Sequence, residues 1–296
     1  MANTLGTLNA ALIAQRGLEL LVSDYPVIGQ IVSDFSNEDV KYNQTITTRI
    51  PSVGSVQDYD TTNGYVATGV NTTDVSVTLN KFKHASFELN DAEFSATNRN
   101  LVEDYAMAFS SAIGQQIMSD ISALFVSGNY SNATTQAVSG ATRKTVIVAP
   151  NTALNKRNVM KNRFGIFNSD LYGQLLTDDS LVDLTFKGVG IAETQLPVVH
   201  GVAFSEYSNL PTTANLIGVI GAKDAIVFAS RVPSDAGFAD LPAVGRISVV
   251  TEPKSGLSIQ VRESYSMTKG SRQVTYCLIY GAAKGNSASL QRIISA

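Results

Sequence analysis

The sequence predicts an α+β fold with an N-terminal arm, an extended β-hairpin, a domain built on one long helix, and an α/β domain. Three observations support this prediction. Residues 45–89 alternate between apolar and polar side chains, as half-buried strands do. Residues 101–125 carry an apolar side chain at every fourth position, which is typical of a helix. Beyond residue 145, short apolar runs alternate with helical segments, which is typical of mixed α/β structure.

The composition is that of a globular chain with few charges on its surface. The chain has 296 residues, of which 44% are hydrophobic and 16% are charged, against roughly 25% charged in ordinary soluble domains. A polar but weakly charged surface loses little free energy when another subunit covers it. The single Cys277 lies in an apolar run and is expected to be a core residue. The sequence contains no run of about 18 apolar residues, so it predicts no membrane-spanning helix.

The charges are polarised along the chain. Residues 1–120 hold 14 acids and 6 bases, whereas residues 121–169 hold 6 bases and no acid. This basic segment is either a solvated face paired within the molecule or a complementary patch for another subunit or a polyanion. Its candidate subunit-interface residues are Arg143, Lys144, Lys156, Arg157, Lys161 and Arg163.

The first elements are an arm and a long hairpin. Residues 5–22 form an amphipathic arm or short helix that stops at Tyr25-Pro26. Residues 45–89 form two strands separated by the turn-forming run Asp58-Tyr-Asp-Thr-Thr-Asn-Gly64. Because an isolated two-stranded ribbon is only marginally stable, we expect this ribbon to lie on something else.

Two lysines interrupt the apolar face of the ribbon's second half. Lys81 and Lys83 lie on the same strand face as the apolar residues between Val75 and Leu89. The interruption predicts two half-strands, 75–79 and 85–89, with the lysines at the junction. Their long stems can cover apolar surface while the ammonium groups reach solvent or an acidic neighbour, so both are candidate interface residues.

A long helix follows the ribbon. Asn100 is a suitable N-cap with Glu103 three residues later, and Ser127-Gly128 ends the pattern. Roughly 26 residues at about 1.5 Å each give a rod near 40 Å long. Its apolar stripe predicts core packing and consists of Leu101, Tyr105, Phe109, Ile113, Ile117, Ile121 and Phe125.

The second half reads as an α/β block. Val146–Ala149 is expected to be a short strand, and Asn151-Thr152 to begin a helix that runs to about Lys161. Residues 164–167 predict another strand, and Asn168 is expected to cap the next helix. Further strands or short buried segments are predicted at 197–204, 216–220, 225–229, 247–250, 258–261 and 273–281.

Sites for chemistry are poorly represented. Two histidines and one cysteine cannot make a dedicated Cys/His zinc site, and no glycine-rich phosphate loop ends in Gly-Lys-Ser/Thr. Asp178, Asp179 and Asp183 are best explained as acids at a helix start. We therefore expect no catalytic, cofactor-binding or metal-ligating residues. The alternative is a small α/β hydrolase with His200 as its base, for which no nucleophile motif is present.

Several stretches, taken in order, carry a resemblance to a known family. They are 75–91 ("VSVTLNKFKHASFELND"), the helix at 101–125, 197–204 with Asn209-Leu-Pro211, 221–233, and Tyr280-Gly-Ala282. This order resembles the major capsid protein of tailed bacteriophages, which has the Hong Kong 97 fold. The resemblance implies four parts: an N-terminal arm at 1–42, an extended loop at 43–78, a peripheral domain with a spine helix at 79–144 and 263–296, and an axial domain at 145–262.

The resemblance also implies a structural function without a cofactor. Members of this family assemble into pentamers and hexamers, which close into an icosahedral shell around double-stranded DNA. The implied location is the virion, and the host cytoplasm during assembly; the implied partners are a scaffolding protein and a portal protein, without a membrane or sequence-specific DNA binding. No long N-terminal coiled coil is present, so a separate scaffolding protein is expected, and the turn at 58–64 has no lysine with which to cross-link.

Two further expectations complete the interpretation. Within the same fold, an encapsulin-like nanocompartment shell is the alternative; it would enclose cargo enzymes and lack a portal. The charge imbalance leads to the hypothesis that residues 121–169 meet acidic surface from residues 34–60 or 88–104 of a neighbour.

Overall fold

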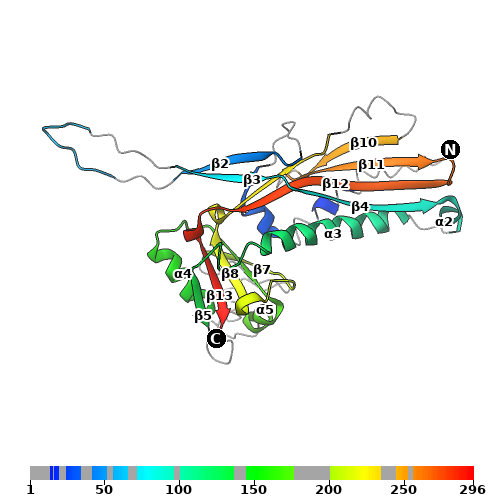
Figure 1. The fold of residues 1–296 in the computed structure, drawn as a ribbon. Coiled ribbons are helices and arrows are strands. Elements are labelled where there is room, and N and C mark those ends of the chain that lie inside the picture. Colours follow the sequence, from blue (N-terminus) through cyan, green and yellow to red (C-terminus); the bar gives the residue numbers. More distant parts are fainter. Residues whose placement is uncertain are drawn as a thin grey trace, which may run out of the picture.

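The computed structural model describes residues 14–15, 17–19, 25–34, 42–51, 56–65, 72–96, 101–136, 145–176, 201–234, 245–252 and 256–296. These residues build a six-stranded sheet, a five-stranded sheet and a two-stranded ribbon. Figure 1 shows a horizontal arm that contains the six-stranded sheet, a lower lobe that contains the five-stranded sheet, and a ribbon that projects beyond the arm. The expected α+β class is confirmed.

The arm sheet has the order β1-β9-β12-β11-β10, and β4 also pairs with β12. Because β12 is long, its residues 271–280 pair with β4 and its residues 279–284 pair with β9. All of these pairs are antiparallel except β1 with β9. The strands are β1 (Val32–Asp34), β4 (Lys81–Asn90), β9 (Ile226–Arg231), β10 (Gly245–Thr251), β11 (Ser258–Ser266) and β12 (Ser271–Lys284).

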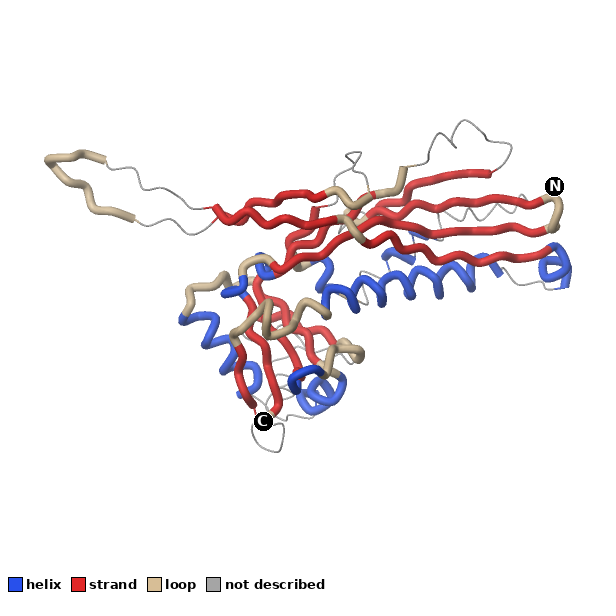
Figure 2. Tube along the Cα trace, viewed as in Figure 1, coloured by secondary structure: helices blue, strands red, loops and turns tan. Residues whose placement is uncertain are grey.

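One long helix, α3 (Leu101–Ser122), runs along the arm sheet, with the short α2 (Asp91–Ala96) before it (Figure 2). The predicted stripe is confirmed from Phe109 onward, because Phe109 packs against the main core and Ile113, Ile117 and Ile121 are buried in it, whereas Tyr105 is 44% exposed. The helix ends three residues before Phe125, which is still buried in the same core. The predicted cap, Asn100, lies outside the described residues.

The lower lobe contains a sheet with the order β5-β13-β8-β6-β7, in which β6 and β8 are wholly buried. The predicted cap of α5 is confirmed, because Asn168 Oδ1 accepts a hydrogen bond of 3.0 Å from Leu171 N. The elements of the lobe are β5 (Ala133–Gln136), α4 (Thr145–Lys156), β6 (Arg163–Phe167), α5 (Ser169–Leu176), β7 (Val202–Glu206), β8 (Leu216–Ala222) and β13 (Leu290–Ser295). Short 3-10 turns occur at η1 (Pro26–Gly29), η3 (Thr213–Asn215), η4 (Lys223–Ala225) and η6 (Ser287–Ser289).

The strand expected at Val146–Ala149 is wrong, because these residues form the first turn of α4. The burial pattern explains the difference: the side chains that pack inward follow helical spacing, whereas Val148 is 42% exposed. A strand would have turned Val148 to the same side as Val146. The helix also ends earlier than expected, at Lys156, since Asn158 has a left-handed backbone with φ of 56°. Its buried positions are Val146, Ile147, Pro150, Asn151 and Leu154.

Each of the two sheets contains strands from both of the expected domains. The resemblance implies that β9 and β10 belong to the axial part, and both lie in the arm sheet with β4 and β12. The final strand, β13, is not predicted as a strand; the resemblance implies that its residues belong to the peripheral part, and they lie in the lower-lobe sheet. The division into peripheral and axial domains stays a prediction. Long-range pairing is the physical reason for the difference, because it joins residues 133 and 292 in one sheet.

Candidate subunit-contact surfaces

The ribbon is built from β2 (Thr45–Pro51) and β3 (Thr72–Thr78), which pair antiparallel over seven residues each. Its apolar side packs on the arm, where Val75, Val77 and Leu79 form a cluster with side chains of β9 and β12. The approach is close, since a Cβ at Gly281 of β12 would lie 2.2 Å from the carbonyl oxygen of Thr78. The expectation that the ribbon lies on another part of the fold is confirmed at its base.

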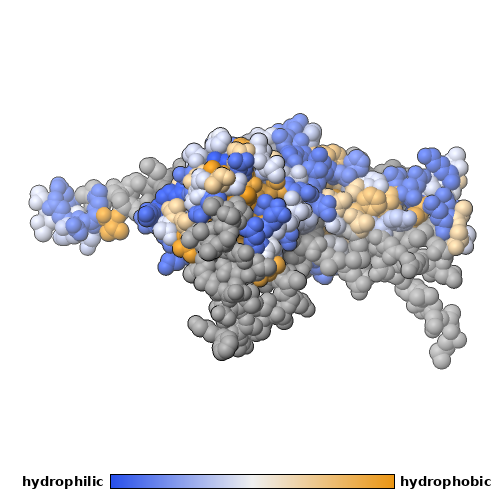
Figure 3. Space-filling model, turned by 90° about the horizontal axis from the view of Figure 1, so that it is seen from below, coloured by the Kyte–Doolittle hydropathy of each residue, from blue (hydrophilic) through white to orange (hydrophobic). Residues whose placement is uncertain are grey.

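The ribbon tip is a small hydrogen-bonded turn with exposed aromatic rings. The Asp60 carboxylate accepts hydrogen bonds from Thr62 N at 2.9 Å and Asn63 Nδ2 at 2.6 Å, and these bonds lower the pKa of Asp60. The rings of Tyr59 and Tyr65 lie 4.9 Å apart between centroids, and both tyrosines are exposed. Figure 3 shows the tip as a mainly hydrophilic extension at one end of the molecule. The tip therefore offers two charged carboxylates, Asp58 and Asp60, beside an aromatic pair.

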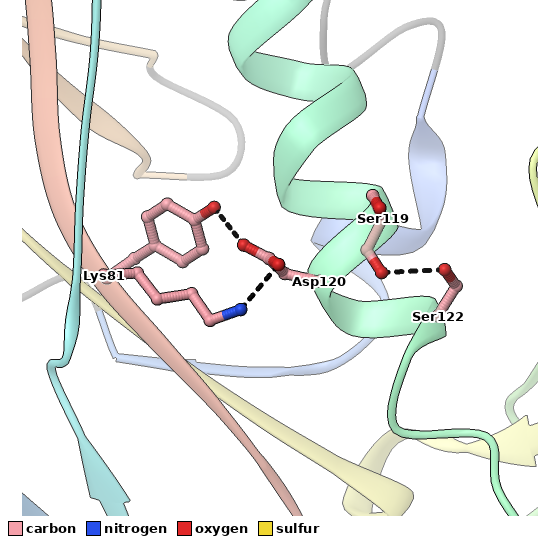
Figure 4. A network of polar contacts seen from close by, with 5 residues as sticks. Lys81, Ser119, Asp120 and Ser122 are labelled. Carbon is pink, nitrogen blue, oxygen red and sulfur yellow. Dashed lines mark hydrogen bonds and ion pairs between the residues drawn. The ribbon is translucent and has the colours of Figure 1, made fainter.

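Lys81 has a partner inside the chain. Its Nζ lies 2.5 Å from Asp120 Oδ1 on α3, and Tyr280 donates a hydrogen bond of 2.5 Å to Asp120 Oδ2 (Figure 4). Burial alone would raise the pKa of Asp120, but the hydrogen bonds from Lys81 and Tyr280 and the charge of Lys81 hold it below its usual value. Burial first, and then the bond to Asp120, raise the pKa of Tyr280.

This network explains how the strand accommodates the first of its two ammonium groups. The predicted break is confirmed, because β3 ends at Thr78 and β4 begins at Lys81. The second half-strand begins four residues earlier than predicted, so both lysines lie within β4 and not at the junction. Lys81 then turns toward the helix and pairs with a carboxylate, whereas Lys83 is exposed. Lys81 is therefore paired within its own subunit, whereas Lys83 is accessible. An interface role for either lysine stays a prediction.

The basic segment divides into internal and exposed cations. Arg163 is buried, and its guanidinium donates to Asn151 O at 3.0 Å, Met160 O at 2.9 Å and Val159 O at 2.8 Å, and also to Asn151 Oδ1. Arg157 donates to Gln291 Oε1 of β13 at 2.5 Å.

Burial lowers the pKa of both arginines, and for Arg163 the charge of Arg157 adds to the effect. Arg163 holds the loop between α4 and β6 together, and Arg157 ties the end of α4 to β13. Lys156 and Lys161 are exposed, whereas Arg143 and Lys144 lie outside the described residues. An interface role for any of the six stays a prediction.

Two of the residues weighed for chemistry, His84 and Cys277, lie opposite each other on the paired strands β4 and β12. His84 is exposed on β4, and Cys277 is buried on β12, where burial raises the pKa of its thiol. His200 and the acids at 178, 179 and 183 lie outside the described residues. Among the residues that the structure does describe, no three or more His, Cys, Asp or Glu side chains gather in a way that could hold a metal ion. No described helix is long and apolar enough to span a membrane.

Sequence reasoning missed the partners of Lys81. Asp120 is 39 positions away on α3, and Tyr280 lies on β12. The available signal was weak: Asp120 follows the helical stripe as the one acid between Ile117 and Ile121. Only the pairing of β4 with β12 beneath α3 brings the three side chains together.

Comparison with known proteins gives a clear answer for the fold alone. No protein-family profile and no curated protein sequence matches the chain. Among solved structures, the capsid of cyanophage P-SCSP1u matches with a TM-score of 0.58 and 9% identity over 90% of this chain and 86% of that chain. The mature capsid of bacteriophage PhiM1 matches with a TM-score of 0.56 and 10% identity, over 90% and 86% of the two chains.

A third match comes from outside the phages. The virus-like particle from Pyrococcus furiosus matches with a TM-score of 0.54 and 10% identity, over 95% of this chain and 97% of that chain. The similarity therefore extends along nearly the whole length of each partner. The resemblance to the major capsid proteins of tailed bacteriophages is confirmed at the level of the fold, and the chain has a capsid-protein fold.

Proposed function

We propose that this chain is a major capsid protein that self-assembles into the shell of a tailed bacteriophage. In this proposal, subunits form pentamers and hexamers, and these rings close into an icosahedral shell of the Hong Kong 97 type around double-stranded DNA. A scaffolding protein and a portal protein take part in assembly, which occurs in the host cytoplasm. The role is structural and non-enzymatic.

The ribbon is the observation that carries this proposal. Its base is fixed on the arm, while its tip presents Tyr65 at 93% exposure and Val56 at 98% exposure. A subunit that worked alone would have no use for apolar side chains held out on a projecting ribbon. A neighbour that covers the tip gives the element a purpose, and repeated head-to-tail contacts of this kind close into rings.

The exposed lysines extend the proposal to electrostatics. Lys156 and Lys161 lie in the acid-free segment, while Asp58 and Asp60 at the ribbon tip are exposed acids. We propose that the exposed lysines meet acidic surface of a neighbouring subunit, from residues 34–60 or 88–104. Arg157 and Arg163 form hydrogen bonds within the subunit, so reversing their charge would disturb the fold, and the charge-reversal test leaves them unchanged.

Two measurements test the proposal. Electron microscopy of the purified protein, in negative stain, is expected to show closed particles; a protein that stays monomeric under all assembly conditions contradicts it. The double variant Lys156→Glu/Lys161→Glu is expected to stay folded and to assemble poorly at moderate salt. Lys269→Glu, also exposed but outside the acid-free segment and not a candidate contact, is the matched control. Normal shells from the double variant would refute the electrostatic part alone.

The match to a virus-like particle from Pyrococcus furiosus supports one second candidate, a shell that is not a phage capsid, and we take this candidate to be an encapsulin-like nanocompartment. Such a shell would enclose cargo protein in place of DNA. The contents of purified particles separate the two, because nuclease-protected DNA supports the phage capsid and a co-purifying enzyme supports the nanocompartment. Portal and terminase genes beside this gene would likewise favour the capsid. A hydrolase that depends on His200 would instead show turnover by a monomer, lost in His200→Ala.

A further inference from the structure

Among the described residues, β10 is a border strand of the arm sheet. In the part of the chain that the structure describes, β11 is its one strand neighbour, and the two pair over all seven residues without a bulge. Alternate backbone N–H and C=O groups of β10 therefore point away from the sheet. Such an edge is a ready template for pairing with another chain.

This border lacks the features that usually protect an edge strand. β10 has the sequence Gly-Arg-Ile-Ser-Val-Val-Thr, with neither proline nor lysine, and Arg246 is its one charge. Other borders of the arm sheet are protected: β1 has three residues, and β4 carries Lys81 and Lys83. Val249 of β10 is 53% exposed, and Ile247 on the same strand face is half-buried. Within the described residues, the edge therefore has backbone groups without a strand partner, beside apolar surface.

We propose that β10 pairs antiparallel with β10 of a second copy, across a two-fold axis beside Ser248. In this register, each Ile247 lies opposite Val249 of the second copy. The isoleucine of each copy therefore covers the exposed valine of the other copy. Arg246 lies opposite Val250, and the two Arg246 side chains are four residues apart, about 13 Å along the strands. That spacing exceeds the Debye length of about 8 Å at physiological salt, so the like charges interact weakly.

The position of β10 argues for a second copy as the occupant. This argument rests on the proposed shell function. β10 lies on the side of the arm opposite the lower lobe (Figure 1). In a ring whose lower lobes gather around the axis, the β10 borders face outward, toward the adjacent ring. A two-fold contact is self-complementary, so identical borders of two rings can pair. One strand pair is a small contact, and its repetition over the shell would give it strength.

A cysteine placed on the axis tests the register. Ser248→Cys is expected to give disulfide-linked dimers when assembled particles are oxidised, because the two thiols then face each other. Arg246→Cys is the matched control on the same strand face. It is the more exposed position, so non-specific oxidation would favour it, yet the proposed register keeps its two thiols about 13 Å apart. We expect at least tenfold less cross-linked dimer from the control. Native Cys277 is buried and supplies the background.

The possible outcomes are distinguishable. Closed particles without a Ser248→Cys cross-link overturn the pairing and leave the shell function intact, and equal cross-linking at Arg246→Cys also overturns it. Mixed particles in which Ser248→Cys links to Thr47→Cys identify the ribbon of a neighbour as the occupant. If no particles form, the shell function fails, and absence of the cross-link in the soluble protein overturns the pairing as well. Adding Val249→Lys to Ser248→Cys is expected to abolish the cross-link while the circular dichroism spectrum stays unchanged.

Discussion

Replacing Lys81 by methionine is expected to destabilise the fold in a pH-dependent way. The substitution removes the 2.5 Å contact with Asp120 but keeps an apolar stem of similar length. Hydrogen bonds to charged groups contribute about 1.5–3 kcal/mol each. The Lys81 side chain is 34% exposed, so solvent screening reduces its share. We expect the free energy of unfolding to fall by about 1–2 kcal/mol at neutral pH.

The pH dependence follows from the pKa of Asp120. This pKa lies below 3.8 in the folded parent, so the network stabilises the fold above about pH 4, and the stabilisation is lost as the pH falls through the folded pKa. In Lys81→Met, burial remains while its main counter-effect is gone, so the pKa of Asp120 rises. The difference in unfolding free energy between parent and variant should therefore be largest at neutral pH and shrink on acidification.

Denaturant titrations from neutral pH down to about pH 3 measure this difference. Lys83→Met is the matched control: it lies two residues away on the same strand and is exposed, so we expect a change within about 0.5 kcal/mol. A double-mutant cycle with Asp120→Asn should assign most of the effect to the pair. Equal losses for the two lysine variants, or a loss independent of pH, would refute the reasoning.

Three further predictions concern the ribbon seat, the basic loop and the helix. Gly281→Ala is expected to destabilise the fold by about 1–3 kcal/mol or to displace the ribbon, because its Cβ would clash with backbone; Gly128→Ala, which meets nothing within 4 Å, is the control in thermal unfolding. Arg163→Met should cost more than about 3 kcal/mol by denaturant titration because it leaves buried carbonyl groups unpaired, whereas Lys161→Met should be nearly neutral. Ile117→Ala, in the middle of α3, should cost about 2–5 kcal/mol, and a smaller loss would mean that the helix packs loosely on the sheet.

Local patterns predict the elements whose cause is local. The break before Lys81 is readable because an apolar face carries two charges in succession, and no single core face tolerates them. The cap at Asn168 is readable because its side chain satisfies the helix that follows directly. The strand β6 is predictable because residues 164–167 form one continuous apolar run, all of which is buried. The inward stripe of α3 is predictable because its apolar residues recur at every fourth position.

Pairing over long distances could not be predicted in the same way. Val146–Ala149 is apolar and β-branched, which favours a strand, but packing of α4 on β13 selects the helix. β13 itself pairs with β8 and β5, from two other regions of the chain, so neither the domain boundary nor the lobe sheet follows from composition. The border position of β10 is equally invisible in the sequence, because an edge strand and a central strand can have the same residues.

The described contacts indicate that the ribbon is positioned by its own subunit before any neighbour arrives. Two contacts hold the ribbon on the arm, and a third fixes the start of β4 just after the ribbon ends. Val75 and Val77 pack against β9, Gly281 lets β3 lie close on β12, and Lys81 of β4 reaches Asp120 on α3. An element held in its binding geometry loses less conformational entropy on association than one that must be ordered by the contact. Because the ribbon is already positioned, modest contacts at its tip are enough for association with a neighbour. We therefore expect the loss of any one of these contacts to impair assembly before it unfolds the subunit.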